Sequence, residues 1–225
     1  MRLGLISDVH ANAPALAIVL DDLRSRGIER VLCAGDIVGY YPFPNETISL
    51  LTEHCVLSIQ GNHDRSVLHV NTSQMNPYAR DVVDWTARHL NEAGRHYLEG
   101  LPRFTTVHSD HLAVSMHHGS PRDPVKYVYE EEATEDLLRV SRSSVLILGH
   151  THIPFVKRFP SGLIVNPGSV GQPRDGDPRA SYSILDTARG KVINHRVEYD
   201  IDKVAQKIDE VGFPRMLGER LYAGF

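Results

Sequence analysis

Five short polar motifs along the chain carry metal-binding residue types, and each of them ends or follows an apolar run. They are Asp8-Val9-His10, Gly35-Asp36, Gly61-Asn62-His63-Asp64, His117-His118-Gly119 and Gly149-His150-Thr151-His152. Their carboxylate, imidazole and amide groups, without a thiolate, suit Mn, Fe or Zn and disfavour copper(I) or an iron–sulfur cluster. Seven candidate ligands exceed the four of a tetrahedral zinc site, so they fit two ions that share a carboxylate. The seven are Asp8, His10, Asp36, Asn62, His118, His150 and His152.

Each motif alone is a weaker indication than the set. An isolated Asp-x-His is as often a helix cap or a turn, whereas Gly149-His150-Thr151-His152 follows an apolar run. Alternation along a strand there would point both imidazoles towards one shared ion. In open α/β sheets the carboxyl ends of parallel strands collect ligands, so motifs that follow several strands converge at one edge. The sequence therefore predicts a metal site at such an edge.

The elements that must position these motifs alternate between strand and helix in the first part of the chain. Apolar runs predict strands over 2–7, 30–34 and 55–59, and helical spacing predicts helices over 12–27 and 45–54. Short links between them predict parallel pairing with helices on the faces of the sheet. A further helical stretch is expected over 76–98, interrupted near Gly94.

The second part of the chain is richer in strands. Strands are expected over 104–108 and 112–117, joined by a turn at Ser109-Asp110, and then over 145–148, 155–159, 163–166, 180–186 and 191–199. Helices are expected over 130–140 and 202–210. Since no long linker divides the chain, we expect a single α/β domain over residues 1–225 with two stacked sheets.

The composition excludes several classes of protein. The net charge of −4 argues against a large nucleic-acid footprint, and the apolar runs are far shorter than a membrane span. Cys33 and Cys55 form no disulfide framework and are expected to be buried packing residues. We therefore expect a cytoplasmic protein with a small-molecule substrate and no stable nucleic-acid or membrane partner. The sequence leaves open whether the protein forms a homo-oligomer.

In their order along the chain, the motifs D-V-H, G-D-I-V-G, G-N-H-D, H-H-G and G-H-T-H resemble the signature of the calcineurin-like metallophosphoesterase superfamily. The run Asn166-Pro167-Gly168-Ser169 resembles its compact bacterial and archaeal phosphodiesterase branch. This resemblance implies a four-layer α/β/β/α sandwich with two stacked mixed sheets and two divalent metal ions at the strand ends. By motif position, one ion would be held by Asp8, His10, Asp36 and His152, and the other by Asp36, Asn62, His118 and His150.

The resemblance also implies roles in catalysis. A hydroxide held between the two metals would attack phosphorus in line, and Asn62 would help stabilise the phosphoryl oxygens. His63 would protonate the leaving alkoxide, with Asp64 orienting its imidazole. His118 is preferred over its neighbour His117 as the ligand, because it precedes Gly119 as in the family's His-Gly block.

Departures from the family pattern narrow the substrate. Gly39 and Tyr40 stand where the protein Ser/Thr phosphatases carry Asp and a phosphate-binding Arg, which counts against a protein phosphatase. Arg65 and Arg174 are candidates for contacting phosphate, each as readily an ordinary surface residue. The loop over 166–178 either lines the site or merely connects strands.

The function expected is therefore that of a metal-dependent phosphodiesterase or phosphatase acting on small phosphate esters. Manganese is the expected metal, with Fe, Zn, Ni or Co as alternatives. The alternative functions are a nucleotidase or dinucleoside polyphosphate hydrolase, and a non-catalytic scaffold like the retromer subunit of this superfamily. That subunit lacks the acid histidine, so the presence of His63 beside Asp64 favours catalysis.

Overall fold

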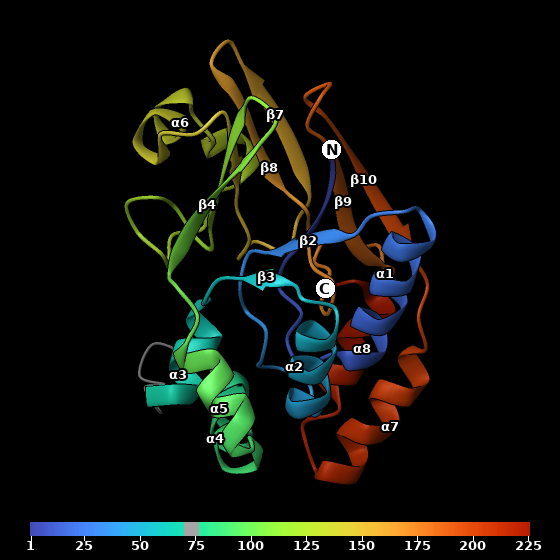
Figure 1. Ribbon diagram of the computed structural model, residues 1–225. Helices are drawn as coiled ribbons and strands as arrows, with labels where there is room; N and C mark the ends of the chain where they lie inside the picture. Colours follow the sequence, from blue (N-terminus) through green and yellow to red (C-terminus); the bar gives the residue numbers. More distant parts are fainter. Residues whose placement is uncertain (70–76) are drawn as a thin grey trace.

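Two five-stranded mixed sheets form the centre of the protein in the computed structural model, which describes residues 1–69 and 77–225 (Figure 1). The first sheet has the strand order β10-β9-β1-β2-β3. Its strands are β1 (Arg2–Ile6), β2 (Arg30–Cys33), β3 (Leu57–Ser58), β9 (Ala180–Asp186) and β10 (Lys191–Val197). β1, β2 and β3 are parallel neighbours, as the sequence predicts, and β9 joins β1 in antiparallel orientation. The carboxyl ends of β1, β2 and β3 therefore meet at one edge.

The second sheet has the order β4-β5-β6-β8-β7. Its strands are β4 (Phe104–Ser109), β5 (Leu112–His117), β6 (Val145–Ile147), β7 (Phe155–Phe159) and β8 (Gly162–Asn166). β5, β6 and β8 are parallel, and β4 and β7 close the two edges in antiparallel orientation. Parallel strands at the centre of both sheets bring a second set of strand ends to the site.

Helices cover the two outer faces. They are α1 (Ala13–Ser25), α2 (Pro44–Glu53), α3 (Asn62–His69), α4 (Pro77–His89), α5 (Glu92–Glu99), α6 (Glu135–Ser141), α7 (Ile201–Val211) and α8 (Met216–Ala223), with a 3₁₀ turn, η1, over Glu130–Glu132. In α1, the side chain of Asn12 accepts a hydrogen bond from the Ala15 N–H at 3.2 Å, and Pro14 occupies the first turn. These are favoured residues at helix starts, so the predicted beginning of α1 is confirmed.

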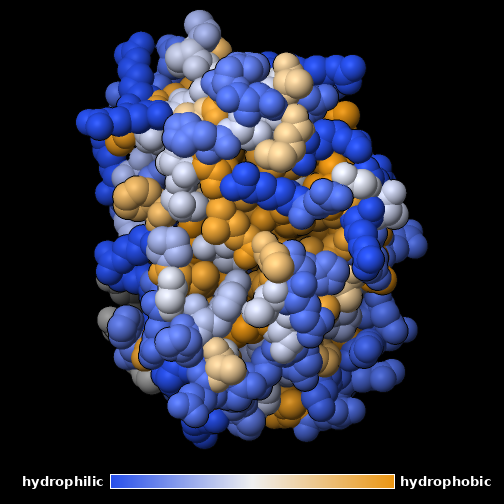
Figure 2. Space-filling view, in the orientation of Figure 1, coloured by the Kyte–Doolittle hydropathy of each residue, from blue (hydrophilic) through white to orange (hydrophobic). Residues whose placement is uncertain are grey.

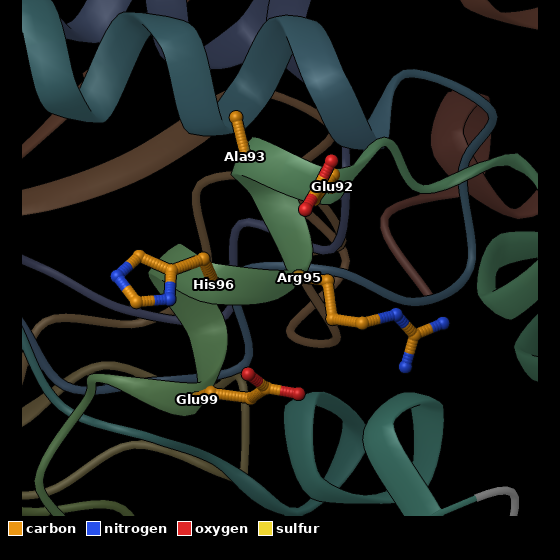
Figure 3. Close-up of a pocket in the computed structure, with 5 residues that line it drawn as sticks. All are labelled: Glu92, Ala93, Arg95, His96 and Glu99. Atoms are coloured by element: carbon orange, nitrogen blue, oxygen red, sulfur yellow. The ribbon is translucent and has the colours of Figure 1, made fainter.

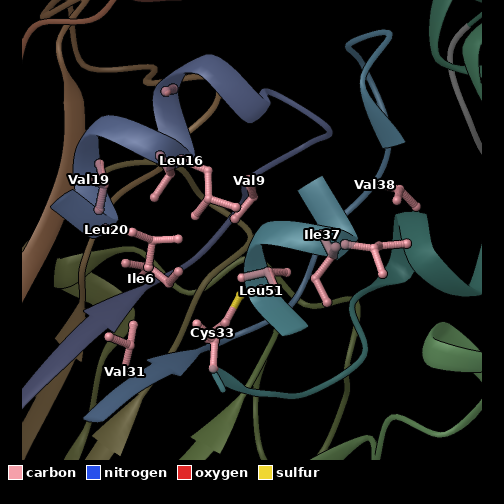
Figure 4. Close-up of a cluster of buried hydrophobic side chains, with 14 of the residues drawn as sticks. Ile6, Val9, Leu16, Val19, Leu20, Val31, Cys33, Ile37, Val38 and Leu51 are labelled. Carbon is pink, nitrogen blue, oxygen red and sulfur yellow. The ribbon is translucent and has the colours of Figure 1, made fainter. Parts of the chain in front are cut away.

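The alternation of β1 shows how the layers are stacked. Leu3 and Leu5 point between the two sheets, where they join the cluster that contains Val114 and Ile147 of the second sheet. Ile6 points to the other face and packs under α1, in the cluster shown in Figure 4. α6 covers the second sheet through Leu138. The order helix, sheet, sheet, helix confirms the expected four-layer α/β/β/α sandwich.

Several predicted boundaries are wrong. The expected strand over 55–59 shrinks to Leu57–Ser58, because Cys55 adopts a left-handed backbone with φ 50° and is exposed rather than buried. The helical stretch expected over 76–98 breaks at Asn91, not at Gly94, since the Asn91 side chain caps α5 by accepting from the Gly94 N–H at 2.7 Å. Residue 76 lies outside the described part of the chain.

The expected helix over 130–140 is also different, because extended backbone at Ala133 and Thr134 divides it into η1 and α6. The sequence analysis did not predict α3 or α8. Across the described residues, no helix is both long and apolar enough to cross a membrane. Figure 2 shows hydrophobic residues exposed across the middle of the face it draws, with hydrophilic residues above and below them.

Candidate metal centre

The polar motifs from both sheets meet in one buried site. Asp8 and His10 follow β1, Asp36 follows β2, and Asn62 and His63 begin α3 just after β3. The second sheet contributes His118 after β5 and His150 and His152 after β6. All of these except the half-buried Asn62 are less than a tenth exposed. The predicted convergence of strand ends is thus observed, and it involves both sheets rather than one.

One group of candidate ligands consists of Asp8, His10 and His152, whose ligand atoms lie within 4.8 Å of one another. The Nε2 atoms of His10 and His152 face each other at 3.0 Å, and His152 Nε2 lies 3.4 Å from Asp8 Oδ1. Two imidazole nitrogens at this separation, next to a carboxylate oxygen, are an arrangement that a shared cation stabilises.

A second group consists of Asp36, His118 and His150. His118 Nε2 lies 3.2 Å from Asp36 Oδ2 and 3.0 Å from Asn62 Oδ1. Asp36 Oδ2 is also 3.7 Å from His10 Nε2, and Asp36 forms a third group with His10 and His63. Asp36 therefore stands between the two groups, in the position of a bridging carboxylate.

Backbone carbonyl groups fix the orientation of two of these imidazoles. His118 Nδ1 lies 2.9 Å from the Ala34 carbonyl oxygen, and His152 Nδ1 lies 2.6 Å from that of Gln172. Because a carbonyl oxygen only accepts, each Nδ1 carries the proton and donates it. In the neutral ring the lone pair of Nε2 then points into the site, as it does in histidines that bind metals.

The residues fit a pair of divalent cations. Asp36 Oδ2 is buried and forms no well-aligned hydrogen bond with any described residue, although imidazole nitrogens of His10 and His118 lie within 4 Å of it. A buried carboxylate oxygen in that state is costly unless a cation binds it. Oxygen and imidazole donors without thiolate agree with the metals expected from the sequence. The assignment of each residue to one ion remains a prediction.

Electrostatics in the site follow from burial and from Asp36. Burial lowers the pKa of His10 and His152, and it lowers that of His150 to about 4, so these rings stay neutral at pH 7 and can act as ligands. Burial also opposes a charged His118, but the Asp36 carboxylate outweighs it and raises the His118 pKa to about 10. The Asp36 carboxylate thus favours a proton on His118, and a cation that binds at His118 would compete with that proton.

The backbone is strained where the candidate ligands lie. Asp8, His10, Asp36, His150 and His152 all have positive φ, between 50° and 69°. Such conformations cost of order 1–3 kcal/mol each in non-glycine residues, and they cluster at functional sites. They also correct the expected alternation of His150 and His152. β6 ends at Ile147, and the two left-handed residues send their imidazoles into different groups rather than towards one ion.

Asp64 is a second correction. Its carboxylate accepts hydrogen bonds from the Val38 N–H at 2.9 Å and from the Gly61 N–H at 2.8 Å, and the Nδ1 atom of His63 has no hydrogen-bond partner among the described residues. The reason is that α3 begins at Asn62, so Asp64 lies in the first helical turn and holds the loops instead of the imidazole. The His63 ring is held by ring contacts to His10 and Tyr40.

The remaining predicted residues divide into two kinds. Arg174 lies at the site: its guanidinium donates to Gln172 Oε1 at 2.8 Å and stands over the Tyr40 ring at 5.7 Å. The loop over 166–178 therefore lines the site. The half-buried Arg65 side chain forms no hydrogen bond or ion pair with the candidate ligands among the described residues. His117 stacks on Phe104 of the neighbouring strand and belongs to none of the candidate ligand groups, which agrees with the preference for His118 as the ligand.

Tyr40, Tyr41 and Gln172 are site residues that sequence reasoning missed. The fully buried Gln172 donates to Tyr41 Oη at 3.0 Å, while its backbone carbonyl accepts from His152. The two tyrosines follow the Gly-Asp motif within a few residues, in the run Gly39-Tyr40-Tyr41. This position was the one feature of the sequence that could have indicated them. A separate hollow of about 500 Å³ on α5 carries no comparable cluster, since Arg95 and His96 point in different directions (Figure 3).

Comparison with known proteins agrees with this geometry. The calcineurin-like phosphoesterase superfamily domain matches residues 1–190. A metallophosphoesterase from Sphaerobacter thermophilus is 36% identical, with a TM-score of 0.86 over 100% of this chain and 99% of its own. An uncharacterized protein of Methanocaldococcus jannaschii is 36% identical over 99% of this chain and 98% of its own length. Phosphodiesterase YfcE of Escherichia coli K12 is 28% identical, covering 83% of this chain and 88% of its own. The chain belongs to the calcineurin-like phosphoesterase superfamily.

Proposed function

We propose that the protein is a hydrolase of small phosphate esters that depends on two divalent metal ions. Asp8, His10, Asp36 and His152 would hold one ion, and Asp36, Asn62, His118 and His150 the other. The observation that supports this most directly is the buried Asp36 Oδ2, which lies between His10 Nε2 and His118 Nε2 at 3.7 and 3.2 Å. Manganese is the proposed metal, with Fe, Zn, Ni or Co as alternatives.

When bound, two such ions lower the pKa of water, so that a nucleophile is present at neutral pH, and they offset charge on the phosphoryl oxygens. The chain supplies the other functions. The Asn62 amide and the Arg174 guanidinium would bind nonbridging phosphate oxygens; this assignment is supported by their position at the edge of the buried ligand groups. Arg174 is preoriented by Gln172, which reduces the entropy lost on binding.

His63 is the proposed proton donor to the leaving alkoxide. Its burial lowers its pKa, with His118 and Arg174 acting in the same direction and Asp36 opposing them. The imidazole is therefore neutral at pH 7 in the free site. A bound phosphate ester brings negative charge next to the ring and favours protonation, so His63 would become a competent acid once substrate is present.

The test is reconstitution. Chelated protein is loaded in turn with Mn, Mg, Zn, Ni or Co, its metal content is measured, and turnover is followed on p-nitrophenyl phosphate, bis(p-nitrophenyl) phosphate and cyclic nucleotides. Asp36→Asn is the matched variant, because it keeps the shape of the bridge and removes its charge. We expect about two ions per chain and turnover in the parent protein, and loss of both in the variant. Metal-loaded protein that turns over none of the esters would support the scaffold alternative instead.

Preference among those esters assigns the subclass. Faster turnover of the diester indicates a phosphodiesterase, and faster turnover of the monoester indicates a phosphatase.

Gly39 leaves room for two of the imidazoles, because a Cβ added there would lie 2.7 Å from His63 Nδ1 and 2.9 Å from His10 Nδ1. An aspartate cannot fit at this position without displacing both rings. This supports a way of binding substrate that differs from that of the protein phosphatases.

A further inference from the structure

An exposed aromatic pair lies beside the metal centre, on the loop between β5 and η1. Tyr127 is 44% exposed and Tyr129 is 37% exposed, and Val125 on the same loop is 46% exposed. Isolated exposed apolar residues are common, but a cluster at the rim of a polar site indicates contact with a ligand. The two tyrosines have no role in the hydrolysis described above.

The loop is fixed to the site, so the two rings are presented at a defined place. The Val125 carbonyl oxygen lies 3.1 Å from His150 Nε2, and the ring of Tyr127 stacks on the His150 ring with a centroid separation of 3.9 Å. Val128 between the two tyrosines is 3% exposed, so the buried side chain points inwards and both tyrosine rings lie on the outer side of the loop. Their rings are nearly parallel, at 11°, with centroids 6.2 Å apart.

The backbone of this loop is held by its own hydrogen bonds. Asp123 Oδ1 accepts from the Val125 N–H at 3.0 Å, and Ser120 Oγ accepts from the Asp123 N–H at 2.9 Å. At the other end, the Tyr129 N–H donates to the Glu132 carboxylate at 3.2 Å. Rings carried on a fixed backbone lose little conformational entropy when a ligand stacks on them.

Tyr127 also borders the site at which phosphate is proposed to bind, because its ring stacks on that of the candidate ligand His150. The Arg174 guanidinium borders the same site over the ring of Tyr40, which in turn contacts the His63 ring. A phosphate bound at the metals and at Arg174 would therefore leave the rest of the ester beside Tyr127 and Tyr129. In a nucleoside phosphate, one sugar separates the phosphate from the base, so the base is the part of the ester that would reach these rings.

We propose that Tyr127 and Tyr129 form a stacking surface for a planar aromatic ring in the substrate, so that the site prefers phosphate esters of nucleosides to those of plain sugars or alkyl alcohols. The inference rests on the proposed function, since it takes the phosphate to be bound at the metal centre. Stacking of one base on aromatic side chains corresponds to about 5- to 150-fold in affinity, from about 1–3 kcal/mol at 1.4 kcal/mol per tenfold.

The test compares two ligands that differ only in the base, adenosine 5′-monophosphate and ribose 5-phosphate. Their affinities are measured by calorimetry on manganese-loaded His63→Ala protein, with a check that the ligands remain intact. We expect the nucleotide to bind at least about fivefold more tightly. Replacing both tyrosines with leucine should bring the ratio close to one while the affinity for ribose 5-phosphate stays unchanged. Replacing both with phenylalanine should retain the preference, because the rings remain.

Tyr222→Leu is the matched control, because this tyrosine is also exposed but lies on α8 with its hydroxyl on Asp202. It should leave the ratio unchanged. Equal affinities for the two ligands in the protein with its tyrosines intact would overturn the inference, as would an equal loss for both ligands in the leucine variant. Failure of the proposed function would look different, because neither ligand would bind and no ester would be turned over with any metal.

Discussion

Replacing His63 with alanine separates proton donation from metal binding. His63 is 6% exposed, its Nδ1 has no hydrogen-bond partner in the part of the chain that the structure describes, and it is not a ligand of either ion in the proposed assignment. Loss of a positioned general acid lowers the rate by about 10²–10⁴-fold, or about 3–5 kcal/mol. That loss should appear only where the leaving group needs a proton. An alkoxide needs one, whereas p-nitrophenolate is stable without it.

The assay measures kcat for His63→Ala with an alkyl phosphate ester and with its p-nitrophenyl counterpart, alongside metal content per chain. We expect full metal content, a loss of at least about 100-fold on the alkyl ester, and a much smaller loss on the p-nitrophenyl ester. Removal of the ring also removes contacts with His10 and Tyr40, at centroid separations of 4.8 and 4.7 Å. Such contacts contribute about 0.5–1.5 kcal/mol each, and their loss would affect both esters alike.

Tyr40→Leu is the control for that packing effect, because it removes a ring contact with His63 and leaves the proton donor in place. It should lower turnover of both esters by the same factor. If His63→Ala also lowered both equally, the role as a general acid would be wrong and His63 would serve only to shape the site. A fall in metal content would instead make it a ligand, in line with its proximity to His10 and Asp36.

Three further predictions test the surroundings of the site. Gly61→Ala should lower metal content and the melting temperature, because the new Cβ would overlap the Asp36 carboxylate; Gly176→Ala, where φ is positive but the added Cβ would meet open space, should retain full metal content. Gln172→Leu should raise KM more than it lowers kcat, because it frees the Arg174 guanidinium; an unchanged KM would remove Arg174 from substrate binding. Native protein at pH 8 should present one thiol to a thiol reagent, since Cys55 is exposed while burial raises the pKa of Cys33 to about 12 and keeps its thiolate scarce; two fast thiols would contradict this.

The sequence contained most of the information on which residues meet, because the motifs follow strands and parallel strands bring their ends together. The sequence could not show in which direction the side chains of the candidate ligands point. His150 and His152 reach two different groups through left-handed backbone, and alternation along a strand does not describe that conformation. The role of Asp64 depends equally on where α3 begins, since one residue of shift would change which groups its carboxylate can reach.

Contacts between segments that are distant along the chain could not be predicted from the sequence either. Gln172 has no motif of its own, yet it links His152, Arg174 and Tyr41, because its loop folds back over the strand ends. Periodicity and motif order report on local structure, whereas the partners of a buried amide are set by tertiary packing. The same holds for Tyr127 and Tyr129, which look like ordinary loop residues until their loop is placed against His150.

The strained ligands depend on the loop that follows β8. The segment runs beside the residues after β1, where the Val170 N–H donates to the Ser7 carbonyl oxygen and the Gly171 N–H to that of Asp8, both at 3.0 Å. Ser169 Oγ adds a third bond, to the Asp8 carbonyl oxygen at 2.6 Å. These bonds join the two sheets at the point where Asp8 has a left-handed backbone, so they hold a conformation that the local sequence does not favour. Long-range hydrogen bonds therefore hold the left-handed backbone of Asp8, so the loop that carries Arg174 also positions one of the candidate metal ligands.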